Sequence, residues 1–133
     1  MWGSARLAPS VRFNLPGRGI TALALAFAGV VIAIAGVCSF RASRTSVDPR
    51  TPDKASQLVV AGVYRWSRNP MYLGMLLLMT GWGVHLSNAA AFCLLPAFVG
   101  YMTAFQIKPE ERILRAKFGA SYAEYMSAVR RWV

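Results

Sequence analysis

The stretch that decides the fold is GVYRWSRNPMYLGMLLLMTGWG, residues 62–83. It begins as a polar segment that contains Arg65 and Arg68, and it becomes an apolar run without any gap. Asn69 precedes Pro70, and the residue before a proline is biased toward extended backbone. Proline suits the first position of a helix because it has no N–H group to leave unpaired. The stretch therefore predicts an extended polar entry into an apolar helix.

The apolar runs around this stretch predict a membrane protein. The chain has 133 residues, is 56% hydrophobic and carries a net charge of +10, which favours apolar spans with basic flanks over a nucleic-acid-binding domain. Run 19–40 has no charged residue and exceeds the roughly 20 residues that cross a bilayer core. Only Ser87 and Asn88 separate runs 71–86 and 89–107. We expect a single all-α domain with three spans, of which the last two form a tight hairpin.

The distribution of basic residues predicts the orientation in the membrane. Three precede the first run, six lie between the first and second runs, and six follow the third. A hairpin puts the last two groups on one side, which the positive-inside bias makes cytoplasmic. We expect an integral, multi-pass membrane protein with its N-terminus outside and its C-terminus in the cytoplasm.

The two cysteines, Cys38 and Cys93, both lie inside apolar runs. Their spacing gives neither a disulfide framework nor a metal site. We interpret them as small buried apolar residues, and we expect no bound metal.

The segment after the third run predicts two short amphipathic helices that lie along the cytoplasmic face. Pro109 suits a first helical position, and Glu110 and Glu111 follow it in the first turn, where they complement the helix dipole. Gly119 is typical of a helix stop. SYAE, residues 121–124, matches a capping box that would start the next helix.

Several polar residues fall at one predicted membrane face. Glu110 and Glu111 follow the run that ends at Ile107, at the same face as Arg65 and Arg68. Acids, arginines and nearby tyrosines at the mouth of a helix bundle predict a polar pocket. The alternative is that the arginines reach lipid phosphates and the aromatic residues form an interfacial belt. Glycines in the second run more often permit close helix packing than ligand binding.

Three segments together resemble the isoprenylcysteine carboxyl methyltransferase family. They are GVYRWSRNPMYLG, the pair EE after the following span, and FGASYAEYMSAVRRW. The resemblance covers residues 56–133, which we interpret as the cofactor-binding core of a domain that spans 1–133. The related phospholipid N-methyltransferases share Asn-Pro-Met-Tyr-x-Gly, a Gly-Trp in the same helix, and the paired glutamates. Compared with the family, the first N-terminal span is expected to be missing.

The resemblance implies an enzyme that uses S-adenosyl-L-methionine, a methyltransferase of the EC 2.1.1 type. By position, the cofactor-binding residues would be Ser56, Gln57, Leu58, Val59, Tyr64, Asn69, Pro70, Met71, Tyr72 and Glu110. Arg68 and Glu111 would be catalytic, and Gln106 would bind the substrate. Eukaryotic members have an arginine where this chain has Gln106, and the usual histidine before the proline is Asn69.

The methyl acceptor stays open at this point. The resemblance implies a lipophilic or small acceptor that reaches the site from the bilayer, with no nucleic acid and no metal involved. It can be a carboxylate, as in an isoprenylcysteine, a phospholipid amine or a thiol. Two other hypotheses are a non-catalytic small membrane protein on the same scaffold and a membrane reductase that uses a nicotinamide cofactor.

Overall fold

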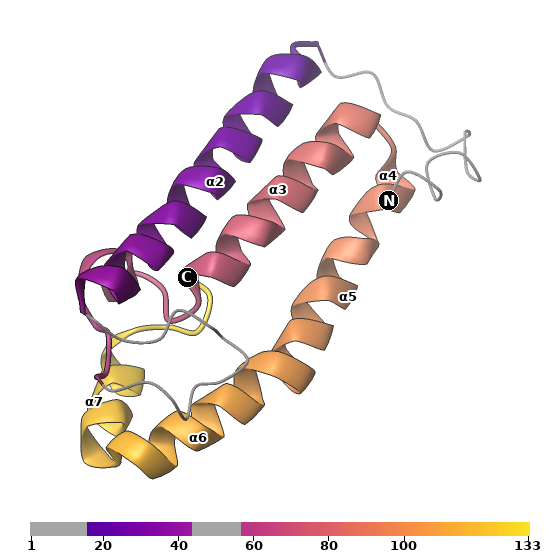
Figure 1. The fold of residues 1–133 in the computed structure, drawn as a ribbon. Coiled ribbons are helices and arrows are strands. Elements are labelled where there is room, and N and C mark those ends of the chain that lie inside the picture. The colour runs from indigo at the N-terminus through magenta and orange to yellow at the C-terminus, as the bar shows by residue number, and fades with distance from the viewer. Residues whose placement is uncertain (1–15, 44–56) are drawn as a thin grey trace.

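The computed structural model describes residues 16–43 and 57–133, and each regular element in these ranges is a helix (Figure 1). The α-helices are α2 (Arg18–Ala42), α3 (Pro70–Leu86), α4 (Ala89–Phe92), α5 (Leu94–Tyr101), α6 (Lys108–Phe118) and α7 (Ala120–Ala128). The 3-10 helix η3 (Gly62–Arg65) precedes α3, and the π-helix η4 (Met102–Ile107) joins α5 to α6. The predicted all-helical class is therefore confirmed for this part of the chain. Ser56 lies outside the described residues.

Two of these helices are long and apolar enough to cross a membrane. They are α2, with 25 residues, and the helix formed by α4, α5, η4 and α6, which has 30 residues over Ala89–Phe118. Helix α3 has 17 residues, about 26 Å at ~1.5 Å per residue, which is shorter than a hydrocarbon core of about 30 Å. The structure thus supports two candidate spans, and the third span stays a prediction.

Helices α2 and α3 lie side by side and run in opposite directions (Figure 1). Glycines let their backbones touch: a Cβ atom built on Gly74 would lie 2.5 Å from the carbonyl oxygen of Gly29. A Cβ atom on Gly81 would lie 2.8 Å from the carbonyl oxygen of Ala22. Small residues allow such close approach in membrane helix pairs. The interpretation of Gly74 and Gly81 as packing residues is therefore confirmed.

The chain turns back between α3 and α4. Ser87 has a positive φ of 48°, and the side chain of Asn88 caps α4 by accepting a hydrogen bond from the Ala90 N–H at 2.9 Å. Arg18 Nη1 donates to Ser87 Oγ at 3.2 Å, which ties the start of α2 to this turn. The following helix then returns to the end of the molecule at which α3 begins (Figure 1).

Helix α6 begins at Lys108 with Pro109, Glu110 and Glu111 in its first turn, as predicted, and it follows η4 without a break in helical backbone. Pro109 removes one hydrogen bond from the ordinary ladder, and the wider π-helical turn lies directly before it. Gly119, with φ 53°, ends α6 as predicted. The capping box at 121–124 is wrong: α7 already begins at Ala120 and has no side-chain cap, so these residues lie within its first turns.

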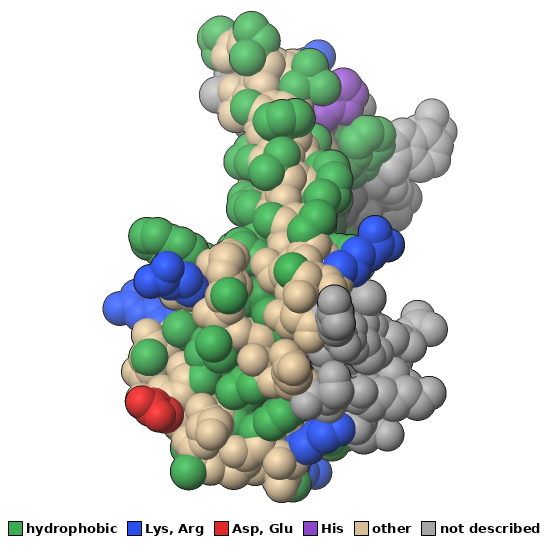
Figure 2. Space-filling view, turned by 60° about the vertical axis from the view of Figure 1, so that its left-hand side comes forward, with side chains coloured by type: hydrophobic (Ala, Val, Ile, Leu, Met, Phe, Trp, Pro, Cys, Tyr) green, Lys and Arg blue, Asp and Glu red, His purple; other side chains and the backbone are tan. Residues whose placement is uncertain are grey.

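Apolar side chains face outward along much of α2. Ile20, Leu23 and Phe27 are each more than 70% exposed. Cys38 and Cys93 are also exposed, so the prediction that they are buried is wrong. The helices form a single layer in this region, so most side chains of α2 are not covered by another helix. Figure 2 shows hydrophobic side chains over the narrow part of the molecule and most charged ones near its wider end, as expected for a helix pair surrounded by lipid.

Candidate active site

The polar entry to α3 is non-helical at Asn69, but it is not extended as predicted. Asn69 has φ −130° and ψ 57°, outside the helical region, as predicted for a residue before proline. The Asn69 N–H donates to Ser67 Oγ at 3.1 Å, and Ser67 is buried. The loop is therefore held in one conformation directly before the helix begins.

Tyr64, in η3, anchors this loop to two other elements. Its ring packs edge-on against Phe40 of α2, with ring centroids 5.2 Å apart. Its carbonyl oxygen accepts a hydrogen bond from the Tyr125 hydroxyl of α7 at 2.7 Å. Burial, above all, raises the pKa of Tyr64, so the phenol stays protonated at neutral pH. Tyr64 thus joins α2, the loop and α7 in one unit.

Glu110 lies on α6 and connects the two halves of the sequence motif. Its Oε1 accepts hydrogen bonds from the Tyr72 hydroxyl and from Gln106 Nε2, each at 2.8 Å. Both donors are uncharged, and within the described residues no cation forms an ion pair with this carboxylate. Glu110 therefore presents a carboxyl group that two neutral donors orient.

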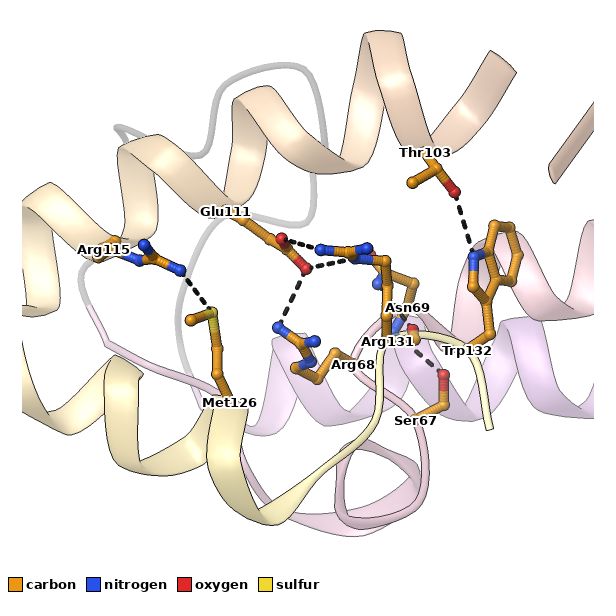
Figure 3. Close-up of polar contacts among 9 residues, drawn as sticks. All are labelled: Ser67, Arg68, Asn69, Thr103, Glu111, Arg115, Met126, Arg131 and Trp132. Carbon is orange, nitrogen blue, oxygen red and sulfur yellow. Dashed lines mark hydrogen bonds and ion pairs between the residues drawn. The ribbon is translucent and has the colours of Figure 1, made fainter. Parts of the chain in front are cut away.

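Glu111, the next residue, is buried and has two charged partners (Figure 3). Arg68 Nη1 lies 3.0 Å from Glu111 Oε1. Arg131 forms a fork, with Nε 2.9 Å from Oε1 and Nη2 2.8 Å from Oε2. Such bidentate pairs are among the strongest side-chain hydrogen bonds, and this one raises the pKa of the Arg131 guanidinium. Arg68 Nε is buried without an acceptor among the described residues.

Residues 129–133, which we call the C-terminal strap, are non-helical, have extended backbone at Val129, and cross the loop. The Arg68 N–H donates to the carbonyl oxygen of Arg130 at 3.1 Å. Asn69 Nδ2 donates to the carbonyl oxygen of Arg131 at 2.9 Å. The strap therefore fixes both the backbone and a side chain of the loop.

The strap is the part of the site that sequence reasoning missed. Arg130 and Arg131 entered it as members of a basic group and of the segment FGASYAEYMSAVRRW, and no role in the site was predicted for either. Trp132 donates from Nε1 to Thr103 Oγ1 on η4 at 3.2 Å (Figure 3), which pairs the end of the strap with a polar residue of the third apolar run. The sequence signal for this contact was weak, because no local spacing links residues so far apart.

The structure brings six of the predicted site residues into one cluster: Arg68, Asn69, Tyr72, Gln106, Glu110 and Glu111. Pro70 and Met71 instead have side-chain atoms against Gly36 of α2, at 3.4 and 3.1 Å from where its Cβ would be. Gln57 is exposed, Leu58 is half-buried and Val59 is buried. None of these three forms a hydrogen bond with the cluster. Within the described ranges, no group of three His, Cys, Asp or Glu residues could hold a metal ion.

The structure has an apolar pair of helices with an arginine–carboxylate cluster at one end. This arrangement is typical of a helical membrane protein with a polar site at the ends of its helices. Residues 18–121 match the sequence model of the phospholipid methyltransferase family. Because this match covers most of the chain, the protein belongs to that family. The resemblance to the phospholipid and isoprenylcysteine methyltransferases is thus confirmed.

Individual relatives agree with this assignment. The chain is 31% identical over 107 residues to protein-S-isoprenylcysteine O-methyltransferase A of Arabidopsis thaliana, covering 80% of this chain and 54% of that protein. It is 35% identical over 72 residues to protein-S-isoprenylcysteine O-methyltransferase of Saccharomyces cerevisiae, covering 54% of this chain and 30% of the yeast protein. An uncharacterised protein of Haemophilus influenzae is 40% identical over 63 residues, which cover 47% of this chain and 100% of that protein. No solved structure matches the chain.

Proposed function

We propose that this protein is a membrane methyltransferase that transfers the methyl group of S-adenosyl-L-methionine to a lipophilic acceptor at the membrane face. The observation that carries the proposal is the contact between Tyr72 and Glu110, because it joins RNPMY and EE into one polar cluster. The two motifs are 38 residues apart at this contact. Membership of the phospholipid methyltransferase family supports the same reaction class.

The cluster has groups that match the parts of this cofactor. Glu110, with neutral partners only, suits the ammonium group or the ribose hydroxyls, which donate strong hydrogen bonds to a carboxylate. Arg68 has a buried Nε without an acceptor among the described residues, which suits the cofactor carboxylate. Tyr64 and Tyr72 offer aromatic faces near a sulfonium. The bound cofactor would supply an electrophilic methyl group, and the chain would hold it in line with the acceptor.

The partners of Glu111 favour an acceptor that needs no general base. Two guanidinium groups occupy both of its oxygens, so proton abstraction by this carboxylate would have to work against two adjacent positive charges. We assign it the role of holding Arg68 in place. A carboxylate or thiolate acceptor can attack the methyl group without losing a proton, and its rate would depend mainly on alignment and exclusion of water.

We further propose that α3 spans the membrane together with the two longer helices, and that the site and the strap face the cytoplasm. The exposed basic residues around the site end of the helices support this orientation under the positive-inside rule. They are Arg41, Arg65, Lys108, Arg112, Arg115, Lys117 and Arg130. Gln106 would then lie where a lipophilic acceptor enters from the bilayer, with its reactive end near Glu110.

A labelled-methyl experiment tests the proposal. Purified protein in detergent is given S-adenosyl-L-methionine labelled on the methyl group together with membranes, and label is counted separately in the lipid, protein and volatile fractions. We expect label in one fraction and a loss of about tenfold or more with Glu110→Gln, since a hydrogen bond to a charged group contributes about 1.5–3 kcal/mol. Glu124→Gln, the same change at an exposed position of α7, is the matched control.

A negative result in this experiment would refute the proposal. If the unaltered protein neither binds the cofactor in calorimetry nor transfers label, the methyltransferase proposal fails. The hypothesis of a non-catalytic protein on this scaffold then takes its place. Binding of a nicotinamide cofactor instead would favour the reductase hypothesis.

A further inference from the structure

We propose that Arg131 is a positioning residue for the methyl-transfer site, and that the C-terminal strap forms one side of that site. This inference rests on the proposed function and extends it to Arg131, which lies at the end of the family segment FGASYAEYMSAVRRW and for which no role in the site was predicted. It is drawn from the contacts of the strap, which reach the loop before α3, η4 and α6.

Arg131 has two separate connections to the site. Its guanidinium holds both oxygens of Glu111, at 2.9 and 2.8 Å. Its carbonyl oxygen accepts from Asn69 Nδ2 at 2.9 Å. A single residue therefore fixes a carboxylate on α6 and the side chain that directly precedes α3.

The neighbouring contacts connect the loop, the strap and α6 to one another. The Arg68 N–H is held by the carbonyl oxygen of Arg130, and the Arg68 guanidinium is held by Glu111, which Arg131 orients from the other side. Loop, strap and α6 thus restrain one another through charged and neutral hydrogen bonds (Figure 3). Removing the Arg131 fork would leave Glu111 with Arg68 alone, so the direction of the Arg68 guanidinium would change along with it.

The burial of the ion pair supports a role in geometry. The Glu111 and Arg68 side chains are each only 11% exposed, whereas the Arg131 side chain is 35% exposed. Arg131 therefore reaches from the partly exposed rim into the buried centre. A rigid planar fork at that position determines orientation in a way that the point charge of a lysine cannot.

The test compares Arg131→Ala and Arg131→Lys with the control Arg112→Ala. Arg112 has an exposed side chain on α6 and takes part in none of the contacts described for the site. The readouts are the Kd for S-adenosyl-L-methionine by calorimetry, the KM and kcat for methyl transfer, the unfolding midpoint in detergent, and hydrogen exchange over residues 129–133. The same measurements are made on Glu111→Gln and on its double variant with Arg131→Ala.

We expect Arg131→Ala to weaken cofactor binding by about ten- to a hundredfold, as for loss of a charge-assisted hydrogen bond, mainly through a higher KM. Arg131→Lys should recover part of the affinity, and Arg112→Ala should bind as the unaltered protein does. The double variant should bind the cofactor at most about twofold more weakly than Arg131→Ala does, because both changes break the same connection. Should Arg131→Ala fail to fold, Arg131→Lys gives the answer, since it keeps the charge and removes only the fork.

Two kinds of outcome overturn the inference. Cofactor binding by the unaltered protein distinguishes them. If that protein binds the cofactor and a folded Arg131→Ala variant binds it equally well, or if Arg131→Lys matches the unaltered protein while Arg131→Ala is unfolded, the positioning role alone is refuted. If the unaltered protein fails to bind the cofactor while the strap stays protected from exchange, the proposed function fails and the positioning role fails with it.

Discussion

Replacing Gly74 with alanine should force α2 and α3 apart. The new Cβ would lie 2.5 Å from the carbonyl oxygen of Gly29, whereas ordinary contact begins near 3.4 Å. The shortfall is 3.4 − 2.5, or about 0.9 Å. The obstacle is a backbone oxygen in the middle of a helix, so it cannot rotate away as a side chain would. A gap of 0.5–1 Å forfeits about a quarter to a half of the dispersion energy of each separated contact.

The expected cost is about 1–3 kcal/mol in the free energy of unfolding, the range for overpacked sites. Alanine also favours a helix over glycine by about 1 kcal/mol, and this gain must be subtracted with a control. Gly100→Ala supplies it, because nothing lies within 4 Å of the Cβ that it would add. The difference between the two variants then isolates the helix–helix contact.

The measurement is unfolding in mixed detergent and sodium dodecyl sulfate micelles, followed by circular dichroism. The double variant with Gly29→Ala should cost less than the sum of the single variants, because both side chains oppose the same close approach. If Gly74→Ala were as stable as Gly100→Ala, the backbone contact between α2 and α3 would not exist as described. The assignment of Gly74 to packing would then be lost.

Three further predictions concern the site and its membrane side. Tyr72→Phe should weaken S-adenosyl-L-methionine binding in calorimetry by about tenfold, because it removes one donor that orients Glu110, whereas the exposed Tyr101→Phe should have no effect. In a methyl-transfer assay, Arg68→Ala combined with Tyr72→Phe should cost less than the sum of the two single changes, and additive losses would argue against one shared site. In a background without the native cysteines, His85→Cys and Arg112→Cys should react with an impermeant thiol reagent from opposite faces, and labelling from one face would refute the membrane crossing.

Local sequence signals predicted the parts of the fold that depend on neighbouring residues. The non-helical backbone at Asn69 follows from Pro70, the end of α6 follows from Gly119, and the length of α2 follows from an uninterrupted apolar run. Each of these signals acts within a few residues. The capping box at 121–124 failed because Gly119 allowed α7 to start at Ala120, so these residues lie within the first turns of the helix and not at its cap.

Contacts across the chain were predictable only in part. The meeting of Tyr72 with Glu110 could be expected, because a turn at Ser87 and Asn88 returns the chain to the same end. The fork between Arg131 and Glu111 could not, since a basic residue near the end of an amphipathic helix is ordinarily solvated. The π-helix was equally hidden, because it depends on how the helix accommodates Pro109 rather than on a hydrophobic pattern.

The length of the helix over Ala89–Phe118 sets how far the two carboxylates of α6 lie from the membrane core. Its 30 residues measure about 45 Å at ~1.5 Å per residue, which exceeds a hydrocarbon core of about 30 Å by ~15 Å. If the apolar end fills the core, the excess is the last ten or so residues, and these include Glu110 and Glu111. The carboxylates then stand at a fixed height above the acyl chains, level with lipid headgroups. A bilayer that is thicker or thinner by a few ångströms would move both of them relative to an acceptor anchored in that bilayer, so membrane thickness itself becomes a determinant of which acceptors can be methylated.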